Sequence, residues 1–358
     1  MSKLTLSRRE FVGKSSLALG LAGLVHGQSR ATGEKTGTSQ AKILNYDERM
    51  DYRQLGKTGW MVSAVSLGGH WKRLGLKGPE FEKNRADVVA KCVDSGFNYI
   101  DACWAGETVA YAKALKSIGK RDKVYLGFSS GEKEMRFEDY RTKKALLKGY
   151  EESLLAAGLD HADLWRVTCL EPGRMHTFGE VFEMVEAGEK AVKDGKCRAF
   201  GISSHDRRWL ELVVKNFPVI SVILMPYTAR SKRKPKGSLF DALQKHDVGF
   251  FGIKPFASNS MFKGDSQTGN PHEEADNERA RQALRYVLCN DALSSPIPGL
   301  ISVAQVDNCL KAIAERREFD LQAAAPGIMK DKRFAQAADE MWHRLPSDYQ
   351  WLRDWEWV

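Results

Sequence analysis

Length, composition and charge already exclude several classes of protein. The chain has 358 residues and 42% of them are hydrophobic, so it can bury a large core and is neither disordered nor fibrous. The 55 lysines and arginines against 46 aspartates and glutamates give a formal net charge of +9, but these charges are scattered and indicate no nucleic-acid partner. The six cysteines contain no C-x-x-C pair, so no zinc finger, zinc ribbon or ferredoxin-type cluster is predicted.

The N-terminus carries the pattern of an export signal. Residues 7–14 read S-R-R-E-F-V-G-K, and the apolar stretch 17–25 that follows is too short to span a bilayer of about 30 Å as a stable helix. This order resembles a twin-arginine signal, which implies the twin-arginine translocation (Tat) machinery as a partner and a periplasmic or other extracytoplasmic location. An ordinary basic tail is the alternative. We expect residues 1–27 to be the signal peptide and residues 28–49 a flexible, polar linker.

Beyond residue 50, short β-branched or aromatic runs alternate with longer segments of helical period, which is typical of βα units around a parallel sheet. The pattern predicts eight strands: Val62–Leu67, Phe97–Asp101, Val124–Ser129, Leu164–Cys169, Ala199–Ser203, Val222–Tyr227, Phe250–Phe256 and Ile297–Leu300. It predicts helices over Arg85–Ser95, Tyr140–Ala157, Glu180–Lys193 and Asn277–Leu288. Eight units favour a single (β/α)₈ TIM barrel over residues 50–318, with a C-terminal aromatic-rich extension over residues 319–358. A doubly wound sheet is disfavoured because no Gly-rich turn follows the first strand.

Several motifs resemble the aldo-keto reductase family over residues 52–315. The motifs are Y-R-Q-L-G-K-T-G at 52–59, G-F-N-Y-I-D-A at 96–102, G-K-C-R-A-F-G-I-S at 195–203 and I-P-G at 297–299. The resemblance implies an N-terminal hairpin, the barrel fold, and an enzyme that transfers a hydride between NAD(P) and a small carbonyl or alcohol substrate. Members of the family usually use an Asp-Tyr-Lys-His tetrad at the C-terminal ends of the barrel strands.

This tetrad is mostly absent from the chain. Asp101 matches the aspartate, whereas Gly106 stands at the tyrosine position, or Trp104 if the loop is shorter. Ser129 replaces the lysine and Thr168 replaces the histidine. In the family the lysine lowers the pKa of the tyrosine, and a tryptophan has only an N–H donor and cannot pass on a proton.

A buried Asp101 without its lysine needs another cation. By topology the nearest candidates are Lys254, after the seventh predicted strand, and His70, after the first. Asp101, His70, Lys254 and Trp104 are therefore the candidate catalytic residues. For Lys254, pairing with Asp101 alone or contact with a cofactor phosphate are equally good interpretations.

The resemblance also assigns residues to the cofactor. These are Ser203 and Ser204 near the carboxamide, Tyr227 stacked on nicotinamide, Pro255 and Phe256 near the pyrophosphate, and Gly299 and Gln305 in the last phosphate-binding turn. Gln305 stands where an arginine often grips the 2′-phosphate of NADP, and Leu224 stands where a glutamine holds the amide. The resemblance thus implies NAD(P) with a weakened clamp for NADP.

Three functions remain open on the residues alone. The first is an exported oxidoreductase with tightly held NAD(P), acting on a carbonyl, an alcohol or a sugar. The second is a barrel repurposed for non-redox acid/base chemistry on a carbohydrate, through Asp101, His70 and Lys254. The third is a non-catalytic ligand-binding protein. No metal is predicted, because no His, Cys or carboxylate pair has ligand spacing.

Overall fold

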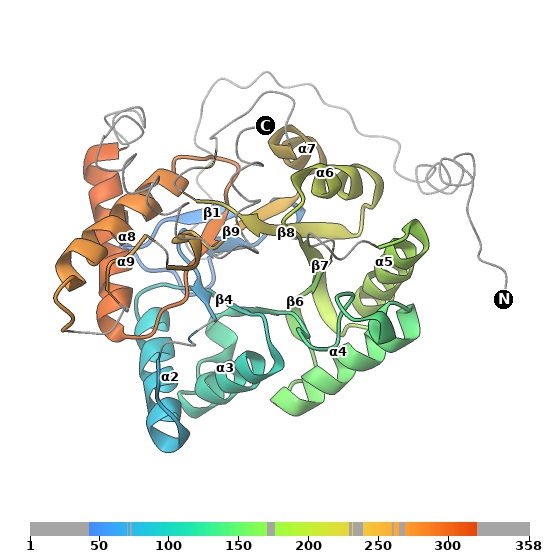
Figure 1. Cartoon of the computed structure of the whole chain (residues 1–358), viewed down its shortest axis with the longest axis horizontal. Coiled ribbons are helices and arrows are strands. Elements are labelled where there is room, and N and C mark those ends of the chain that lie inside the picture. Colours follow the sequence, from blue (N-terminus) through green and yellow to red (C-terminus); the bar gives the residue numbers. More distant parts are fainter. Residues whose placement is uncertain are drawn as a thin grey trace.

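A computed structural model describes residues 43–69, 71, 74–169, 176–228, 231, 239–259, 261–264 and 269–320. Within these ranges a ring of strands is surrounded by helices, as Figure 1 shows. The expected signal peptide (1–27), the extension beyond residue 320 and His70 lie outside the described residues.

The ring is one sheet of parallel strands. Its order is β3 (Leu67–Gly68), β4 (Tyr99–Ala102), β5 (Tyr125–Phe128), β6 (Ala162–Thr168), β7 (Cys197–Ser203), β8 (Ile220–Pro226), β9 (Gly249–Ile253) and β10 (Ser295–Ile297). The last strand returns to the first through a parallel bridge between Gly68 and Gly299, and Gly68 N–H donates to Pro298 O at 2.8 Å. The predicted (β/α)₈ barrel is therefore confirmed.

Most predicted strands are close to those observed, but the last one shares only Ile297 with β10, and the first one is wrong in its extent. Its N-terminal part belongs to a separate antiparallel hairpin of β1 (Tyr52–Gln54) and β2 (Met61–Ser63). The barrel strand itself is only the two residues of β3, because Ser63 N–H donates to the Asn98 side chain and the chain turns before joining the sheet. The hairpin expected at residues 52–59 is thus present, with its second strand further on.

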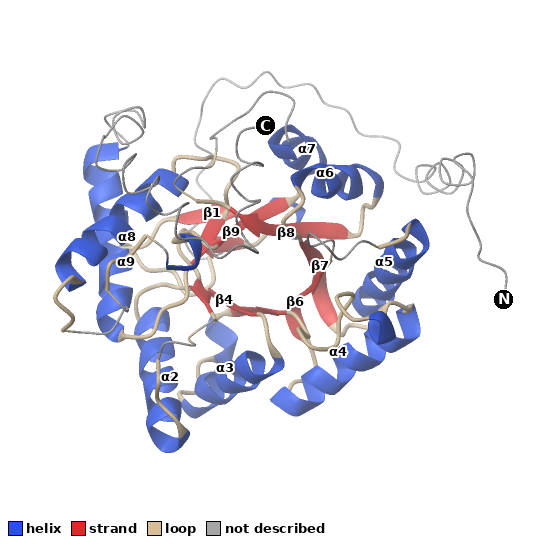
Figure 2. Cartoon of the chain, viewed as in Figure 1, coloured by secondary structure: helices blue, strands red, loops and turns tan. Residues whose placement is uncertain are grey.

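Helices form the outer layer in Figure 2. They are α2 (Gly78–Val93), α3 (Ala105–Ser117), α4 (Lys143–Ala157), α5 (Phe178–Lys193), α6 (Arg207–Asn216), α7 (Leu239–His246), α8 (Glu273–Val287) and α9 (Val303–Glu315), followed by a short π-helix, η6 (Arg316–Asp320). Short 3₁₀ turns lie at η2 (Gly56–Thr58), η3 (Arg121–Lys123), η4 (Glu138–Tyr140) and η5 (Ala257–Asn259). Helix α5 begins with a capping box, in which Thr177 accepts from Glu180 N–H and Glu180 accepts from Thr177 N–H.

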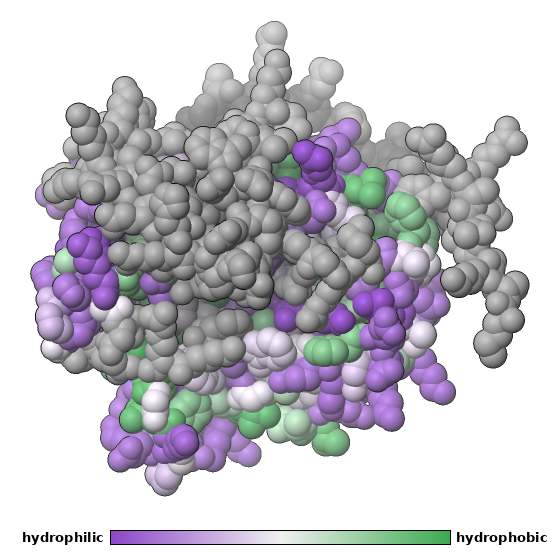
Figure 3. Space-filling view, viewed as in Figure 1, coloured by the Kyte–Doolittle hydropathy of each residue, from purple (hydrophilic) through white to green (hydrophobic). Residues whose placement is uncertain are grey.

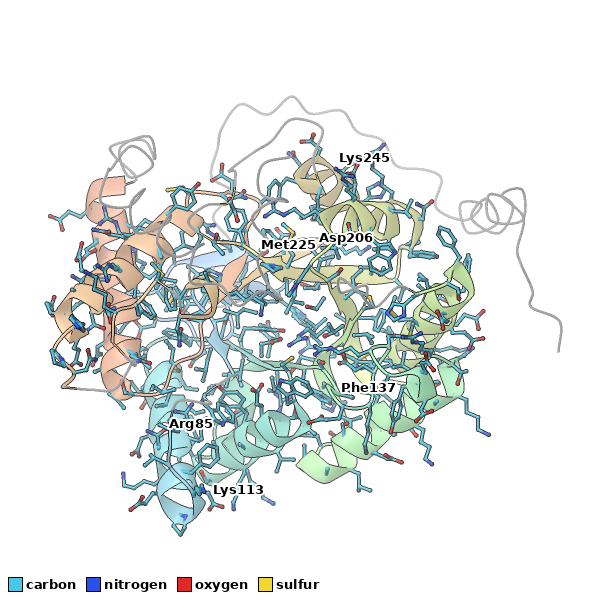
Figure 4. All side chains as sticks on the ribbon, viewed as in Figure 1. Arg85, Lys113, Phe137, Asp206, Met225 and Lys245 are labelled. Carbon is cyan, nitrogen blue, oxygen red and sulfur yellow. The ribbon has the colours of Figure 1, made fainter. Side chains whose placement is uncertain are left out.

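Side-chain parity along the strands separates two parts of the core. Tyr99 and Leu164 point into the barrel, whereas Trp165 points outward and stacks on Tyr150 of α4 with ring centroids 4.2 Å apart. Figure 4 shows side chains filling the centre of the ring, and it labels Met225 of β8, which belongs to the outer core. Inward positions near the C-terminal ends of the strands are therefore the ones that can reach a ligand.

The last residues of the expected linker pack against the barrel. The side-chain amide of Asn45 donates to Val93 O at 2.7 Å and to Phe97 O at 3.1 Å, and Leu44 contacts the interior core. The folded unit therefore includes residues 43–49, which we had assigned to the linker. Figure 3 shows that the described helices present mostly hydrophilic residues with scattered hydrophobic ones. Within the described residues, no helix combines the length and apolarity that a membrane crossing requires.

Candidate active site and cofactor pocket

Asp101, at the end of β4, forms a buried bidentate ion pair with Arg166 of β6. Arg166 Nε donates to Asp101 Oδ1 at 3.0 Å and Nη2 donates to Oδ2 at 2.6 Å, and both side chains are nearly inaccessible to solvent. Burial opposes the charge on Arg166, but the Asp101 carboxylate outweighs it and holds the pKa of Arg166 well above its ordinary value. The cation that pairs with Asp101 is therefore Arg166, and our expectation of Lys254 or His70 in this role was wrong.

Tyr99, two residues before Asp101 on β4, also binds the Asp101 carboxylate. Its hydroxyl donates to Asp101 Oδ1 at 3.2 Å, and burial followed by the nearby carboxylate raises the pKa of Tyr99 well above its ordinary value. Gly127 of β5 faces the same hydroxyl, and a Cβ at Gly127 would collide with it. Tyr99 is thus a structural hydrogen-bond donor and not a substitute for the acidic tyrosine of the family.

The two other replaced tetrad positions are joined by Glu134, from the loop after β5. Its Oε1 accepts from the Ser129 hydroxyl and its Oε2 accepts from Thr168 N–H at 3.0 Å. Glu134 is fully buried, and this burial raises its pKa in spite of nearby arginines. The carboxylate therefore links Ser129 and Thr168, the positions of the missing lysine and histidine. The sequence held no signal for this contact, because Glu134 lies in a loop without periodicity.

Trp104 and Arg136 cover this network. The Arg136 guanidinium lies 5.2 Å from the centre of the Trp104 ring and its Nε is 3.9 Å from Glu134 Oε2. Trp104 Nε1 and Thr168 Oγ1 are both buried, and neither has a hydrogen bond to any described residue. Two buried polar atoms at the C-terminal ends of β4 and β6 are suited to a ligand oxygen.

His205 follows β7 and Lys254 follows β9, so both lie at the C-terminal face of the barrel. Burial first, and then the positive charges of Lys254 and Arg136, lower the pKa of His205 well below its ordinary value, so its imidazole is neutral at pH 7. Lys254 follows β9 with a backbone φ of 55°, a left-handed conformation that is uncommon for a non-glycine residue. The effect of Lys254 on the pKa of His205 shows that the positive charge of Lys254 lies near this imidazole.

A pocket lies between the loop after β9, α8 and the start of α9. The lining residues are Trp71, Phe256, Asn259, Phe262, Asn270, Glu273, Asp276, Asn277, Ala280, Leu284, Gly299, Leu300, Ile301, Ser302, Ala304, Gln305, Asn308 and Cys309. Three of the expected cofactor residues, Phe256, Gly299 and Gln305, thus meet around one pocket. Because they follow β9 and β10, the pocket opens at the C-terminal face of the barrel.

The start of α9 gives this pocket an anion-binding end. Ser302 caps the helix by accepting from Gln305 N–H at 3.3 Å, and the first turn contains no acidic residue. The helix dipole and its first N–H groups therefore favour a phosphate here. The Gln305 carboxamide is held in place, because its Oε1 accepts from Ile301 N–H at 2.8 Å.

The other expected cofactor residues are spread around the mouth. Ser203 ends β7 beside Thr168, its register partner, and Ser204 is buried in the next turn, where its hydroxyl accepts from Asp206 N–H at 3.0 Å. Pro255 is buried next to Phe256. Tyr227 points into the outer core instead, packed edge-on against Phe240 and Phe250, with its hydroxyl accepting from Asn290 at 2.9 Å. This placement does not favour the stacking role that the resemblance implied for Tyr227.

Within the described part of the chain, no group of three His, Cys, Asp or Glu side chains is arranged to hold a metal ion. All six cysteines are described, and none of them forms a disulfide.

Comparison with known proteins gives the family. The family model described as the Aldo/keto reductase family matches residues 64–322. L-galactose dehydrogenase of Arabidopsis thaliana is 25% identical over 289 residues, which cover 75% of this chain and 89% of the relative. The chain belongs to the aldo/keto reductase family of oxidoreductases.

Solved structures agree on the fold. The holo form of an aldo-keto reductase from Bacillus halodurans superposes with a TM-score of 0.58 at 23% identity, covering 75% of this chain and 94% of that structure. An aldo-keto reductase from Klebsiella pneumoniae in complex with NADPH gives a TM-score of 0.59 at 18% identity, covering 84% and 97%.

Proposed function

We propose that this chain is an exported oxidoreductase that uses NAD(P) to interconvert a carbonyl and an alcohol on a small molecule, such as a sugar. The observation that carries the proposal is the convergence of Phe256, Gly299 and Gln305 on one pocket at the catalytic face of the barrel. The names of the relatives support it, since they include an L-galactose dehydrogenase and a structure in complex with NADPH.

The pocket fits a dinucleotide by the chemistry of its lining. Its Gly299 and Ser302 side lies at the N-terminus of α9 and suits phosphate, whereas Phe262, Ala280 and Leu284 offer apolar surface to a base. We assign the carboxamide of the cofactor to Ser203, at the end of β7. When bound, a nicotinamide cofactor supplies or accepts the hydride.

The residues of the mouth would bind the substrate oxygen and move its proton. Trp104 Nε1 and Thr168 Oγ1 are buried donors without a described partner, so they suit a carbonyl or hydroxyl oxygen. We assign the proton to Lys254, whose ammonium gives it to the oxygen on reduction and whose neutral amine takes it on oxidation. His70 is proposed as its partner in this transfer. Asp101 acts only by positioning Arg166, because both of its oxygens are engaged.

Export is the second part of the proposal. The S-R-R-x-F-x-x-K order at residues 7–14 resembles a Tat signal and supports export through the Tat machinery. The resemblance implies a chain that folds before it is transported. Because free nicotinamide nucleotides are scarce outside the cytoplasm, the cofactor would remain tightly bound and be recycled by two substrates in turn. Replacing Arg8 and Arg9 by lysine tests export, since the precursor would then accumulate in the cytoplasmic fraction of a bacterial host. A precursor processed and exported as before would contradict it.

A non-redox function is favoured by one observation. The Ser129–Glu134–Thr168 network fills two positions where the usual tetrad would act on a carbonyl. A barrel of this kind would carry out acid/base chemistry on a carbohydrate through Lys254 and His70, with Asp101 only holding Arg166 in place, or would bind such a ligand without reaction.

One experiment separates these functions. The full chain is matured through its own export route, denatured, and its released small molecules are identified by mass spectrometry. Stoichiometric NAD(H) or NADP(H) is the expected result. If no nucleotide is released and none binds when added, the oxidoreductase proposal fails and the non-redox function takes its place.

A further inference from the structure

The pocket at α8 and α9 has an unusual charge for a site that would hold a phosphorylated adenosine. Its described lining residues include two carboxylates, Glu273 and Asp276, and no lysine, arginine or histidine. We propose that the pocket selects NAD(H) and rejects the 2′-phosphate of NADP(H). This inference rests on the proposed function, because it assumes that the pocket holds a nicotinamide nucleotide.

Both carboxylates are fixed in the first turn of α8. Asp276 accepts from Lys263 N–H at 2.9 Å and from Gly264 N–H at 2.7 Å, and Glu273 accepts from Gly269 N–H. Arg279 Nη1 donates to Asp276 Oδ1 at 3.2 Å and offsets part of the charge of Asp276. A 2′-phosphate carries close to two negative charges, so the fixed carboxylate of Glu273 in the same pocket is the main source of repulsion. A 2′-hydroxyl has the opposite preference, because it can donate a hydrogen bond to a carboxylate.

The arginines behind the pocket wall are already engaged. Arg281 donates to Asn308 Oδ1 at 2.8 Å and forms ion pairs with Glu278 and with Glu315, the latter at 2.9 Å. It is only 9% exposed, so turning toward a phosphate would break contacts on both sides.

Arg85 is the second such arginine. It extends from α2, where Figure 4 labels it, donates to Leu300 O at 2.9 Å, and lies 5.0 Å from the centre of the Trp71 ring. Its guanidinium thus supports two lining residues from behind and does not line the pocket itself.

The residue at position 305 should control the preference for NAD(H) over NADP(H). Gln305 lines the pocket from the first turn of α9, and its carboxamide is neutral and held by Ile301 N–H. An arginine at this position would place a full positive charge at the anion-binding end of the pocket. No described cation lines either end of the pocket, so a 2′-phosphate would lack a positive partner at whichever end the adenosine binds.

The test is a calorimetric titration of the purified, full chain, freed of nucleotide, with NADH and with NADPH. We expect NADH to bind at least tenfold more tightly, and we expect the ratio to shrink as ionic strength rises, because salt screens the repulsion. The fragments ADP and adenosine 2′,5′-bisphosphate repeat the comparison without nicotinamide, and ADP should bind more tightly.

Two variants and one control locate the effect. Gln305→Arg should improve NADPH binding at least fivefold with little effect on NADH, and Glu273→Gln should narrow the NADH preference. Glu274→Gln removes the same charge from the same turn, but Glu274 is 88% exposed and does not line the pocket, so it should leave the ratio unchanged. NADPH binding as tightly as NADH would overturn the inference and leave the proposed function standing. If neither nucleotide binds, the proposed function itself fails.

Discussion

Asp101 and Arg166 form a bidentate ion pair inside the barrel, with oxygen–nitrogen distances of 3.0 and 2.6 Å. Because both oxygens of Asp101 accept hydrogen bonds from Arg166, Asp101 is a structural residue below the barrel mouth and does not transfer a proton. A buried pair of this kind contributes little net stability compared with apolar residues, but removing one partner leaves an uncompensated buried charge.

This pair makes a prediction about stability. Asp101→Asn or Arg166→Met alone should lower the free energy of unfolding by about 3–5 kcal/mol, because each leaves the other charge buried without its partner. The double variant should recover more than half of the summed loss. Urea unfolding of the four proteins in a double-mutant cycle measures this coupling.

The control for this cycle is the exposed pair of Lys83 and Asp87 on α2, whose side chains are 76% and 50% exposed. Its coupling energy should be much smaller. A loss below about 1 kcal/mol for both single variants at Asp101 and Arg166 would contradict the buried pair.

The close contact between Gly127 and Tyr99 makes a second prediction. Gly127→Ala forces a methyl group into the space of the Tyr99 hydroxyl and should cost about 1–3 kcal/mol by overpacking. Tyr99→Phe removes the hydroxyl and should make the alanine less costly, so the two changes should not be additive. Thermal unfolding of the two single variants and the double variant gives the coupling, and simple additivity would contradict the contact.

Glu134 gives a third prediction. Glu134→Leu removes the acceptor of both the Ser129 hydroxyl and Thr168 N–H and should cost about 2–4 kcal/mol, since each buried donor loses its partner. Glu134→Gln keeps an acceptor without a charge and should cost less. Burial raises the pKa of Glu134 above the ordinary 4.5, so the folded chain binds a proton that the unfolded chain releases as the pH rises above 4.5. The stability of the wild type should therefore fall as the pH rises through this region, and the cost of Glu134→Gln should shrink. Equal stability of the leucine and glutamine variants in urea would exclude this network.

His205 gives a prediction about pH. Burial, then Lys254 and Arg136, lower its pKa well below the ordinary 6.5, so below pH 6.5 the unfolded chain binds a proton that the folded chain does not. The free energy of unfolding should therefore fall as the pH drops below 6.5, by up to about 1.4 kcal/mol per pH unit from this group. His205→Gln should flatten this part of the stability curve between pH 7 and 5. An unchanged slope in the variant would place the acid sensitivity elsewhere.

Particular residues show how far sequence alone could lead. The alternation of strand and helix patterns was enough to predict the barrel, and the family motif placed Asp101 at the end of its strand. Arg166 was missed although its position carried a signal, since it has the same parity in β6 as the interior Leu164. An isolated charge at an inward position requires a buried partner, and Asp101 was the one available.

Other contacts had no such signal. Glu134 reaches Ser129 and Thr168 from an irregular loop, and no local pattern predicts where such a loop returns. The role predicted for Tyr227 rested only on its position in the family pattern. Tyr227 lies just beyond the end of β8, where the alternation of inward and outward side chains no longer fixes its direction, and its ring packs on Phe240 and Phe250. Gly299 and Gln305 do line one pocket, because one follows the last strand and the other lies in the first turn of α9, and their role in binding a cofactor stays a prediction.

The most direct test of the central claim, that this pocket holds a nicotinamide nucleotide, is calorimetry on two neighbouring tryptophan variants. Ala304 and Val303 are both exposed in the first turn of α9, but only Ala304 lines the pocket. Ala304→Trp should lower the affinity for NADH at least tenfold, whereas Val303→Trp should change it less than twofold at equal thermal stability. Unchanged NADH binding in Ala304→Trp, or equal loss in both variants, would contradict the assignment of this pocket.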